Sequence, residues 1–216
     1  MTSSFKGRLL AVGVAGAVVA AASIIGSLAR HVAISPVQAA DGYEVSIKPE
    51  WTAKGELMLP KDFRQWVYLG APFTPNALND GKANFPEFHN VYVQPEAFKA
   101  YRETGKWPVG TMMLKELQLV DDQKGEFPDG SRFEPSGRGY FPGPVNGVDV
   151  AVKDPKRFPN SKGWGYFNFN HSAPPYKAAA LEEPIEKCAQ CHIDNAHEDM
   201  VYIKMYKPIL TPLPRQ

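Results

Sequence analysis

The pattern of apolar and polar residues predicts four β-strands. Four segments combine β-branched or aromatic residues with flanking Gly, Pro, Asn or Asp residues, namely 88–93, 111–120, 148–153 and 163–171. In 111–120 the side chains alternate, so that Lys115 shares a face with Met113 and Leu117 while Leu114 lies on the other face. In 148–153 the valines form one apolar face and Asp149 lies opposite them. Lys115 thus lies on a face with apolar neighbours, and Asp149 lies opposite an apolar face.

Helical spacing of apolar residues predicts helices around these strands. The predicted helices cover residues 60–66, 96–104, 178–181, and the segment from Pro184 toward Tyr206. Residues 71–82 and 121–147 are rich in Gly, Pro, Asn and Asp, which predicts long loops, the second with room for one strand. The order of these elements predicts an α+β fold, with a mostly antiparallel sheet and helices packed on one side or end.

The first 40 residues differ from the rest of the chain. Lys6 and Arg8 precede 21 uncharged residues rich in Ala, Val and Gly, and small residues at 37–40 resemble a cleavage site. We therefore predict an export signal over residues 1–40 and a single domain over residues 41–216. The alternative is a retained membrane anchor, because 21 uncharged residues can just span a bilayer.

The charge of the predicted mature chain is close to zero. The whole chain has 24 Lys and Arg residues and 23 Asp and Glu residues. Removal of residues 1–40 leaves 21 basic and 23 acidic residues. No basic run with interleaved aromatic residues occurs, so the composition gives no support to nucleic-acid binding.

The chain has two cysteines, and both lie in Cys188-Ala189-Gln190-Cys191-His192. Two cysteines at this spacing followed by histidine are typical of c-type haem attachment, in which each sulfur bonds the haem and His192 ligates the iron. A zinc site would need a fourth ligand, for which only His197 lies near in sequence. A redox-active dithiol would leave His192 without a role. The motif predicts one covalent haem c, and together with the export signal it predicts a periplasmic protein.

Two groups of residues could shape the chemistry at this haem. Lys115 on an apolar face would be costly unless it were paired, at a rim or chemically altered, although the sheet could instead bury Leu114 and leave Lys115 in water. Asp149 is either solvated or a proton acceptor in a haem pocket. The candidate second axial ligands are His89, His171, His197, Met200 and Met205. The aromatic content of 12% favours instead an apolar pocket that leaves the iron open.

Several segments together resemble one family. They occur in order between Lys54 and Tyr206, at 55–61, 74–82, 91–96, 104–105 with 110–111, 114–117, 152–154 with 156–158, and 188–192. This set resembles the cytochrome P-460 family, which consists of exported mono-haem proteins that oxidise hydroxylamine. The resemblance implies a mostly antiparallel sheet, a homodimer, and a lysine bonded to a meso carbon of the haem.

The resemblance also implies roles for single residues. The matching lysine is Lys115, and the acidic residue of the distal pocket, a glutamate in the family pattern, matches Asp149. The implied activity is haem-dependent hydroxylamine oxidation to nitrous oxide, or to nitric oxide and nitrite. Electrons would pass to an external acceptor such as a c-type cytochrome.

Two other functions remain as alternatives. A nitric-oxide-binding relative, similar to the cytochrome c-prime-beta group, would share the fold without the lysine bond. A plain electron-transfer cytochrome would have a filled sixth position on the iron.

Overall fold

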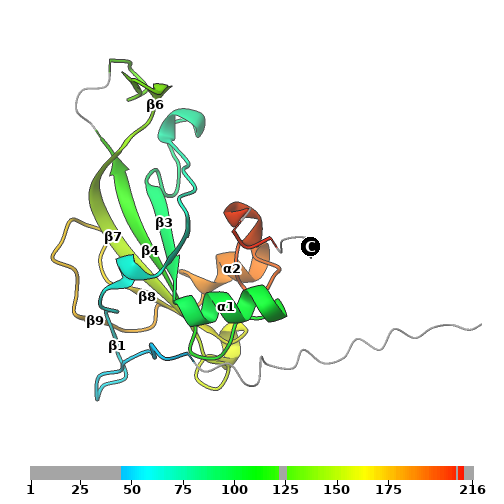
Figure 1. Cartoon of the computed structure of the whole chain (residues 1–216). Coiled ribbons are helices and arrows are strands. Elements are labelled where there is room, and N and C mark those ends of the chain that lie inside the picture. The colour runs from blue at the N-terminus through cyan, green and yellow to red at the C-terminus, as the bar shows by residue number, and fades with distance from the viewer. Residues whose placement is uncertain (1–44, 122–125, 208, 212–216) are drawn as a thin grey trace, which may run out of the picture. The chain divides into compact units, whose positions relative to one another are not determined.

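A five-stranded antiparallel sheet forms the centre of the fold (Figure 1). The computed structural model describes residues 45–121, 126–207 and 209–211. The sheet order is β2 (Val67–Gly70), β3 (Phe88–Val93), β4 (Met112–Val120), β7 (Pro142–Lys153) and β8 (Trp164–Asn168). The predicted α+β fold with a mostly antiparallel sheet is therefore confirmed.

The predicted export signal and its alternative, a membrane anchor, lie outside the described residues. Within the described part of the chain, no helix is both long and apolar enough to cross a membrane.

Short elements surround the sheet. Helix α1 (Pro95–Thr104) begins with proline at its first position and ends at Gly105, whose φ of 72° suits a left-handed C-cap. The other helix is α2 (Ala189–Asn195). Two small ladders pair β1 (Leu57–Met58) with β9 (Ala179–Ala180), and β5 (Arg132–Glu134) with β6 (Gly137–Gly139). Four 3₁₀ turns complete the described elements, at η1 (Phe63–Gln65), η2 (Asn76–Leu78), η3 (Pro159–Ser161) and η4 (Ile203–Tyr206).

Apolar side chains cover both faces of the large sheet. Both helices lie on one side of the sheet in Figure 1, where a buried cluster joins the sheet to α1, α2 and the C-terminal segment. This cluster includes Val93, Trp107, Met113, Tyr166, Ala189, Met200, Ile203 and Leu210. A second cluster on the other face includes Leu57, Phe63, Leu114, Val148, Val150, Val152, Phe158 and Phe167. Neither face of β4 is thus a solvent face along its first half.

The strand register places four residues in one row across the sheet. Val91 pairs with Lys115, Lys115 with Asp149, and Asp149 with Asn168. The next row on the same face begins with Val93 and runs through Met113, Ala151 and Tyr166, within reach of the apolar cluster that contains the helices. Lys115 and Asp149 therefore lie beside that cluster, on the helix-bearing face of the sheet.

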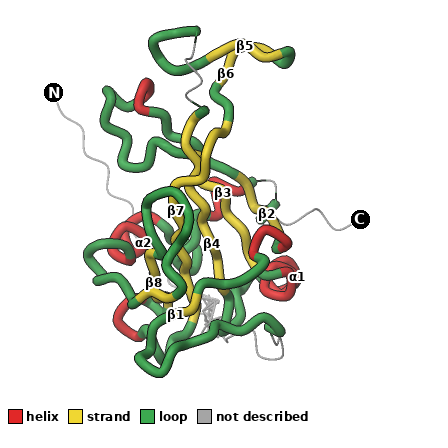
Figure 2. The backbone as a smooth tube through the Cα atoms, turned by 90° about the vertical axis from the view of Figure 1, so that its left-hand side faces the viewer, coloured by secondary structure: helices red, strands yellow, loops and turns green. Residues whose placement is uncertain are grey.

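Several predicted elements are wrong or differ in extent. The loop predicted over 121–147 contains the β5–β6 hairpin, which lies beyond the end of the large sheet in both views, and the first residues of β7 (Figures 1 and 2). Residues 178–181 contain strand β9 rather than a helix, because Ala179 and Ala180 pair with β1. The helix predicted over 60–66 is reduced to the short turn η1.

The long helix predicted from Pro184 toward Tyr206 is also wrong. Only α2 and the turn η4 are helical within this segment. Asp199 and Met200 adopt positive φ angles of 53° and 63°, which a right-handed helix cannot contain. The chain therefore turns between α2 and η4 instead of continuing as one helix.

Gly165 in β8 is expected to be sensitive to substitution. A Cβ atom at this position would lie 2.5 Å from ring atoms of Phe158, which is itself buried in the second cluster. The G165A variant must displace that ring, so we expect it to lose about 1–3 kcal/mol of unfolding free energy. Denaturant unfolding of the haem-loaded protein measures the change.

Gly139 provides the matched control for this prediction. A Cβ atom there would meet Phe141 at 3.8 Å, an ordinary contact. The G139A variant should be unchanged or more stable by up to about 1 kcal/mol. Equal stability of G165A and wild type would contradict the packing described for β8.

Candidate functional site

Lys115 and Asp149 form an ion pair at the centre of the site. They are direct partners on β4 and β7, and Nζ of Lys115 lies 3.0 Å from Oδ2 of Asp149. The side chains are 26% and 24% exposed, so the pair lies partly within the protein rather than on an open surface. The two residues that the sequence singled out separately are thus brought into contact.

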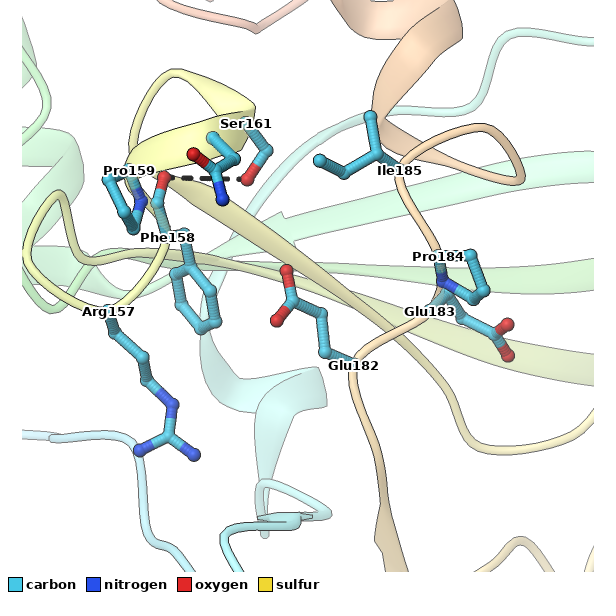
Figure 3. A pocket seen from close by; sticks show the side chains of 9 residues that line it. Arg157, Phe158, Pro159, Ser161, Glu182, Glu183, Pro184 and Ile185 are labelled. Atoms are coloured by element: carbon cyan, nitrogen blue, oxygen red, sulfur yellow. Dashed lines mark hydrogen bonds between the residues drawn. The ribbon is translucent and has the colours of Figure 1, made fainter.

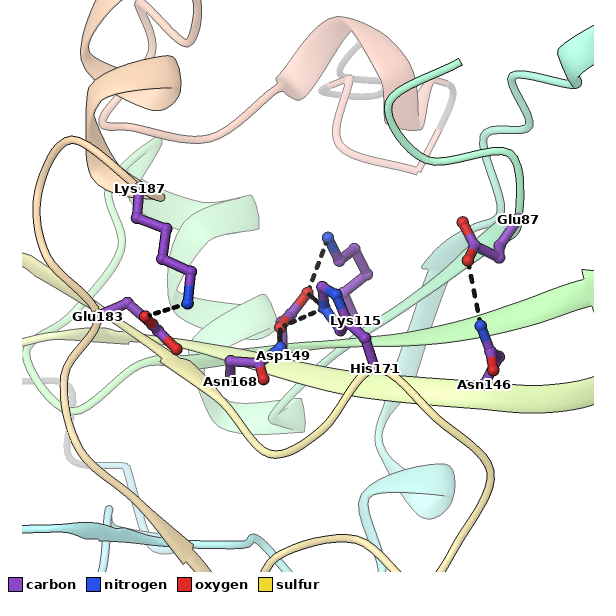
Figure 4. A network of polar contacts seen from close by, with 8 residues as sticks. All are labelled: Glu87, Lys115, Asn146, Asp149, Asn168, His171, Glu183 and Lys187. Atoms are coloured by element: carbon purple, nitrogen blue, oxygen red, sulfur yellow. Dashed lines mark hydrogen bonds and ion pairs between the residues drawn. The ribbon is translucent and has the colours of Figure 1, made fainter. Parts of the chain in front are cut away.

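Asp149 accepts hydrogen bonds from two further residues (Figure 4). Nδ2 of Asn168 donates to Oδ1 at 2.7 Å. Nε2 of His171 lies 3.0 and 3.1 Å from the two carboxylate oxygens. Burial alone would raise the pKa of Asp149, but the hydrogen bond from His171 and the charge of Lys115 outweigh burial and hold that pKa well below its ordinary range. The carboxylate is therefore ionised at neutral pH.

An aromatic ring lies against the lysine. Nζ of Lys115 lies 4.2 Å from the centre of the Phe85 ring, which also makes edge contacts with the rings of His89 and His171. A cation can be stabilised by the face of an aromatic ring, so Phe85 and Asp149 together compensate the ammonium of Lys115. Phe85 and the two histidines thus form an aromatic edge around the ion pair.

Two buried polar atoms near this edge have no partner among the described residues. They are Nε2 of His89 and Oε2 of Glu87, whose other oxygen accepts a hydrogen bond from Asn146 at 3.2 Å. Burial and the charge of Lys115 lower the pKa of His89. Buried polar groups are normally hydrogen-bonded, so this region has the character of a site that receives another group.

His192 is oriented by a carbonyl group. Nδ1–H of His192 donates to the carbonyl oxygen of Met200 at 2.8 Å, which leaves Nε2 available to ligate iron. The positive φ angles of Asp199 and Met200 turn the chain back toward α2, where His192 lies. Burial lowers the pKa of His192 and favours the neutral imidazole, which is the form that binds a metal.

Tyrosine rings border His192 and the two thiols. The rings of Tyr166 and Tyr202 lie 4.6 and 4.9 Å from the His192 ring, centre to centre. The hydroxyl of Tyr202 donates to the carbonyl oxygen of Cys191 at 3.1 Å and contacts its sulfur at 3.2 Å. The hydroxyl of Tyr166 is buried without a partner among the described residues.

These features fit a covalently attached haem. Cys188 and Cys191 are free thiols, one immediately before α2 and one on its first turn. Nε2 of His192 is available to a ligand, because Nδ1 makes the hydrogen bond to Met200. Burial lowers the pKa of His192, the Met200 hydrogen bond raises it, and the charge of Lys115 lowers it further, so Lys115 lies close enough to act on this imidazole. Among the described residues, no group of three or more His, Cys, Asp or Glu side chains is arranged to hold a metal ion. The donor set thus matches haem attachment better than a zinc cluster.

The five candidate axial ligands lie in three different environments. His89 and His171 lie beside the Lys115–Asp149 pair, where His171 bonds the carboxylate. Met200 packs its side chain into the helix-bearing cluster and uses its carbonyl group for His192. His197 and Met205 are exposed. None of these contacts identifies a second axial ligand.

Sequence reasoning did not find Asn168 or Phe85. Asn168 was detectable, because it is a polar residue in the aromatic strand Trp164–Asn168, although its role depends on pairing with Asp149. Phe85 lies in a loop without periodicity, so no sequence pattern indicated that its ring would cover Lys115.

A separate surface pocket has a volume of about 290 Å³ (Figure 3). Its lining residues come from 157–161 and 182–185 and include none of Lys115, Asp149 and His192. The hydrogen bond drawn in it joins Ser161 to the carbonyl oxygen of Phe158 at a long 3.5 Å. We therefore assign the chemistry to the ion pair and the haem motif rather than to this pocket.

Comparison with known proteins agrees with the site. The family model Cytochrome P460 matches residues 60–203, which include the ion pair and the haem motif. No curated protein matches the chain. The family implies a haem c cytochrome whose cofactor contains iron. The chain therefore belongs to the cytochrome P460 family.

Proposed function

We propose that this protein oxidises hydroxylamine at a haem c whose macrocycle is bonded to Lys115. The observation that carries the proposal is the direct contact of a lysine ammonium with an ionised carboxylate, at 3.0 Å, on the helix-bearing face. An ordinary electron carrier needs neither group. A haem that performs proton-coupled chemistry needs a proton acceptor beside it.

Three residues of the motif would hold the cofactor. Cys188 and Cys191 would form the two thioether bonds, and Nε2 of His192 would ligate the iron. When bound, haem c supplies the iron at which hydroxylamine binds and through which electrons leave. The hydrogen bond from His192 to the Met200 carbonyl keeps the imidazole oriented and increases its electron donation.

Lys115 is suited to a covalent role by its surroundings. Its amine lies between Asp149 and the Phe85 ring, and it is only 26% exposed. Bond formation would break one N–H bond of the amine and one C–H bond of the macrocycle and would require an external two-electron oxidant. Asp149 can accept the proton from the amine, because it is already within hydrogen-bond distance. A bond from this nitrogen to the macrocycle would alter haem electronics, one of the means by which a protein adjusts a cofactor.

Asp149 would act as the proton acceptor of the reaction. Oxidation of hydroxylamine releases protons along with electrons, and an ionised carboxylate within the site can take them up. Asn168 and His171 hold the carboxylate in place through three contacts of 2.7–3.1 Å. Aspartate is one methylene shorter than the glutamate of the family pattern, so its reach toward the substrate is reduced.

The proposal includes a location, an electron acceptor and an oligomeric state for the protein. Export of residues 41–216 would place the protein in the periplasm, where an external one-electron acceptor such as a c-type cytochrome would remove the electrons. We propose a homodimer by analogy with the family.

Lys115 is tested by the K115R variant. Arginine retains the positive charge beside Asp149, so the protein should still fold and attach haem, but it should not form the bond to the macrocycle. We expect the strongly red-shifted absorption band of the reduced wild type to be replaced by an ordinary c-type spectrum, with loss of hydroxylamine oxidation. The control is K99R on α1.

Absorption spectra of the reduced proteins decide this prediction. An identical spectrum for K115R and wild type would show that Lys115 is not bonded to the haem. An ordinary spectrum in the wild type would favour the nitric-oxide-binding alternative.

Asp149 is tested by a pair of variants. D149N keeps the size of the side chain but removes the base, so kcat for hydroxylamine should fall by about 10²-fold. D149E restores the carboxylate with a longer reach and should retain or exceed wild-type activity. Steady-state kinetics with a chemical electron acceptor measures both, and D80N in an exposed loop is the control. Full activity of D149N would remove Asp149 from the mechanism.

A further inference from the structure

His171 contacts Asp149 and is also exposed to solvent. Nε2 lies 3.0 and 3.1 Å from the two carboxylate oxygens, and the side chain is 44% exposed. Asp149 is less exposed, at 24%, and its partner Asn168 is an amide that cannot carry a proton, whereas Lys115 is the residue proposed to be bonded to the haem. The imidazole is thus the titratable group that joins the carboxylate to solvent.

The backbone around His171 is held in an unusual conformation. Asn170 has a φ of 139°, which is rare for a residue other than glycine, and its carbonyl oxygen accepts a hydrogen bond from Val148 N at 3.0 Å. Gly147 faces this turn with a φ of 156°. A Cβ atom at Gly147 would lie 2.8 Å from the Asn170 oxygen and 3.1 Å from Cα and Cδ2 of His171. Glycine at this position therefore permits the close approach of His171 to β7.

We propose that His171 carries protons between Asp149 and solvent during turnover, an inference that rests on the function proposed above. A proton from the substrate would move to the Asp149 carboxylate and then to Nε2 of a neutral His171 that carries its own proton on Nδ1. The exposed ring would then release the Nδ1 proton to water. Each proton leaves as the accompanying electron passes to the external one-electron acceptor. His171 acts through Asp149, so it is a positioning and relay residue rather than a catalytic one.

The charges around His171 determine the direction of its pH dependence. The hydrogen bond to Asp149 raises the pKa of His171, and burial opposes this. Below that pKa the ring is protonated and cannot accept a proton from Asp149, so the relay should fail as the pH falls. The charged groups that act on His171 are Asp149 on β7, Lys115 on β4 and Glu87 before β3. The charge of Asp149 also acts on His89 on β3 and on Lys187 and Cys188 ahead of α2.

The first test does not depend on activity. In the haem-loaded protein, reduced under carbon monoxide, NMR of ¹⁵N-labelled histidine reports the pKa of each imidazole. We expect the pKa of His171 to fall by about one pH unit or more in D149N, because the carboxylate partner is lost. His197, which is exposed, should titrate identically in both proteins. An unchanged titration of His171 would overturn the proposal.

The second test compares two partners of the same carboxylate. H171Q keeps a hydrogen-bond donor but cannot titrate, so kcat at saturating hydroxylamine should fall by about tenfold and lose its decline toward acid pH. N168A removes a donor that never titrates, so it should lower the rate and retain that decline. A retained acid decline in H171Q would contradict the relay.

The two tests separate the two proposals. If the wild type does not oxidise hydroxylamine, the proposed function fails, whereas the NMR titration still decides whether His171 and Asp149 share a proton. If oxidation occurs but the His171 titration is the same in D149N, the relay alone fails.

Discussion

The pairing of β4 with β7 is the constraint on which the site depends. This register puts Lys115 directly opposite Asp149 and, one strand further, Asp149 opposite Asn168. A shift of one residue would exchange the faces of β4, so that Leu114 would enter the site and Lys115 the opposite core. Because Leu114 is fully buried among aromatic and valine side chains, such a shift would cost both the core and the ion pair. The packing of Leu114 on one face thus fixes the register that places Lys115 opposite Asp149 on the other face.

Charge compensation explains why such polar residues can occupy a sheet covered on both faces. Lys115 is balanced by Asp149 and the Phe85 ring. On the other face of β4, the buried carboxylate of Glu116 is bound by Arg64 through two hydrogen bonds. A buried charge without a partner is strongly unfavourable, so each of these residues requires its neighbour. The two carboxylates differ in their own exposure, because the side chain of Asp149 is 24% exposed and that of Glu116 is 4% exposed.

Alternation and motif spacing predicted much of this arrangement. They predicted four of the five strands of the large sheet, helix α1, the haem motif, and the face of β4 that carries Lys115, but not β2 or the two small ladders. The sequence left open whether Leu114 faces the core and Lys115 faces water. In the structure Leu114 is fully buried, and Lys115 is 26% exposed on the other face, which is covered as well. The contact of His171 with Asp149 depends on the turn at Asn170 and on Gly147 opposite it. Neither feature follows from the alternation of apolar and polar residues, so the contact could not be predicted from the sequence. The helix predicted through Asp199 and Met200 failed for the same reason, because single residues with positive φ redirect the chain there.

In the proposed protein one haem is bound covalently at both the Cys188–His192 motif and Lys115. Mass spectrometry of the protease-digested, exported protein tests this attachment. We expect the haem-bearing peptide containing Cys188–His192 also to carry the peptide containing Lys115, joined through the macrocycle. Recovery of the Lys115 peptide in unmodified form, with haem attached only to the two cysteines, would contradict it.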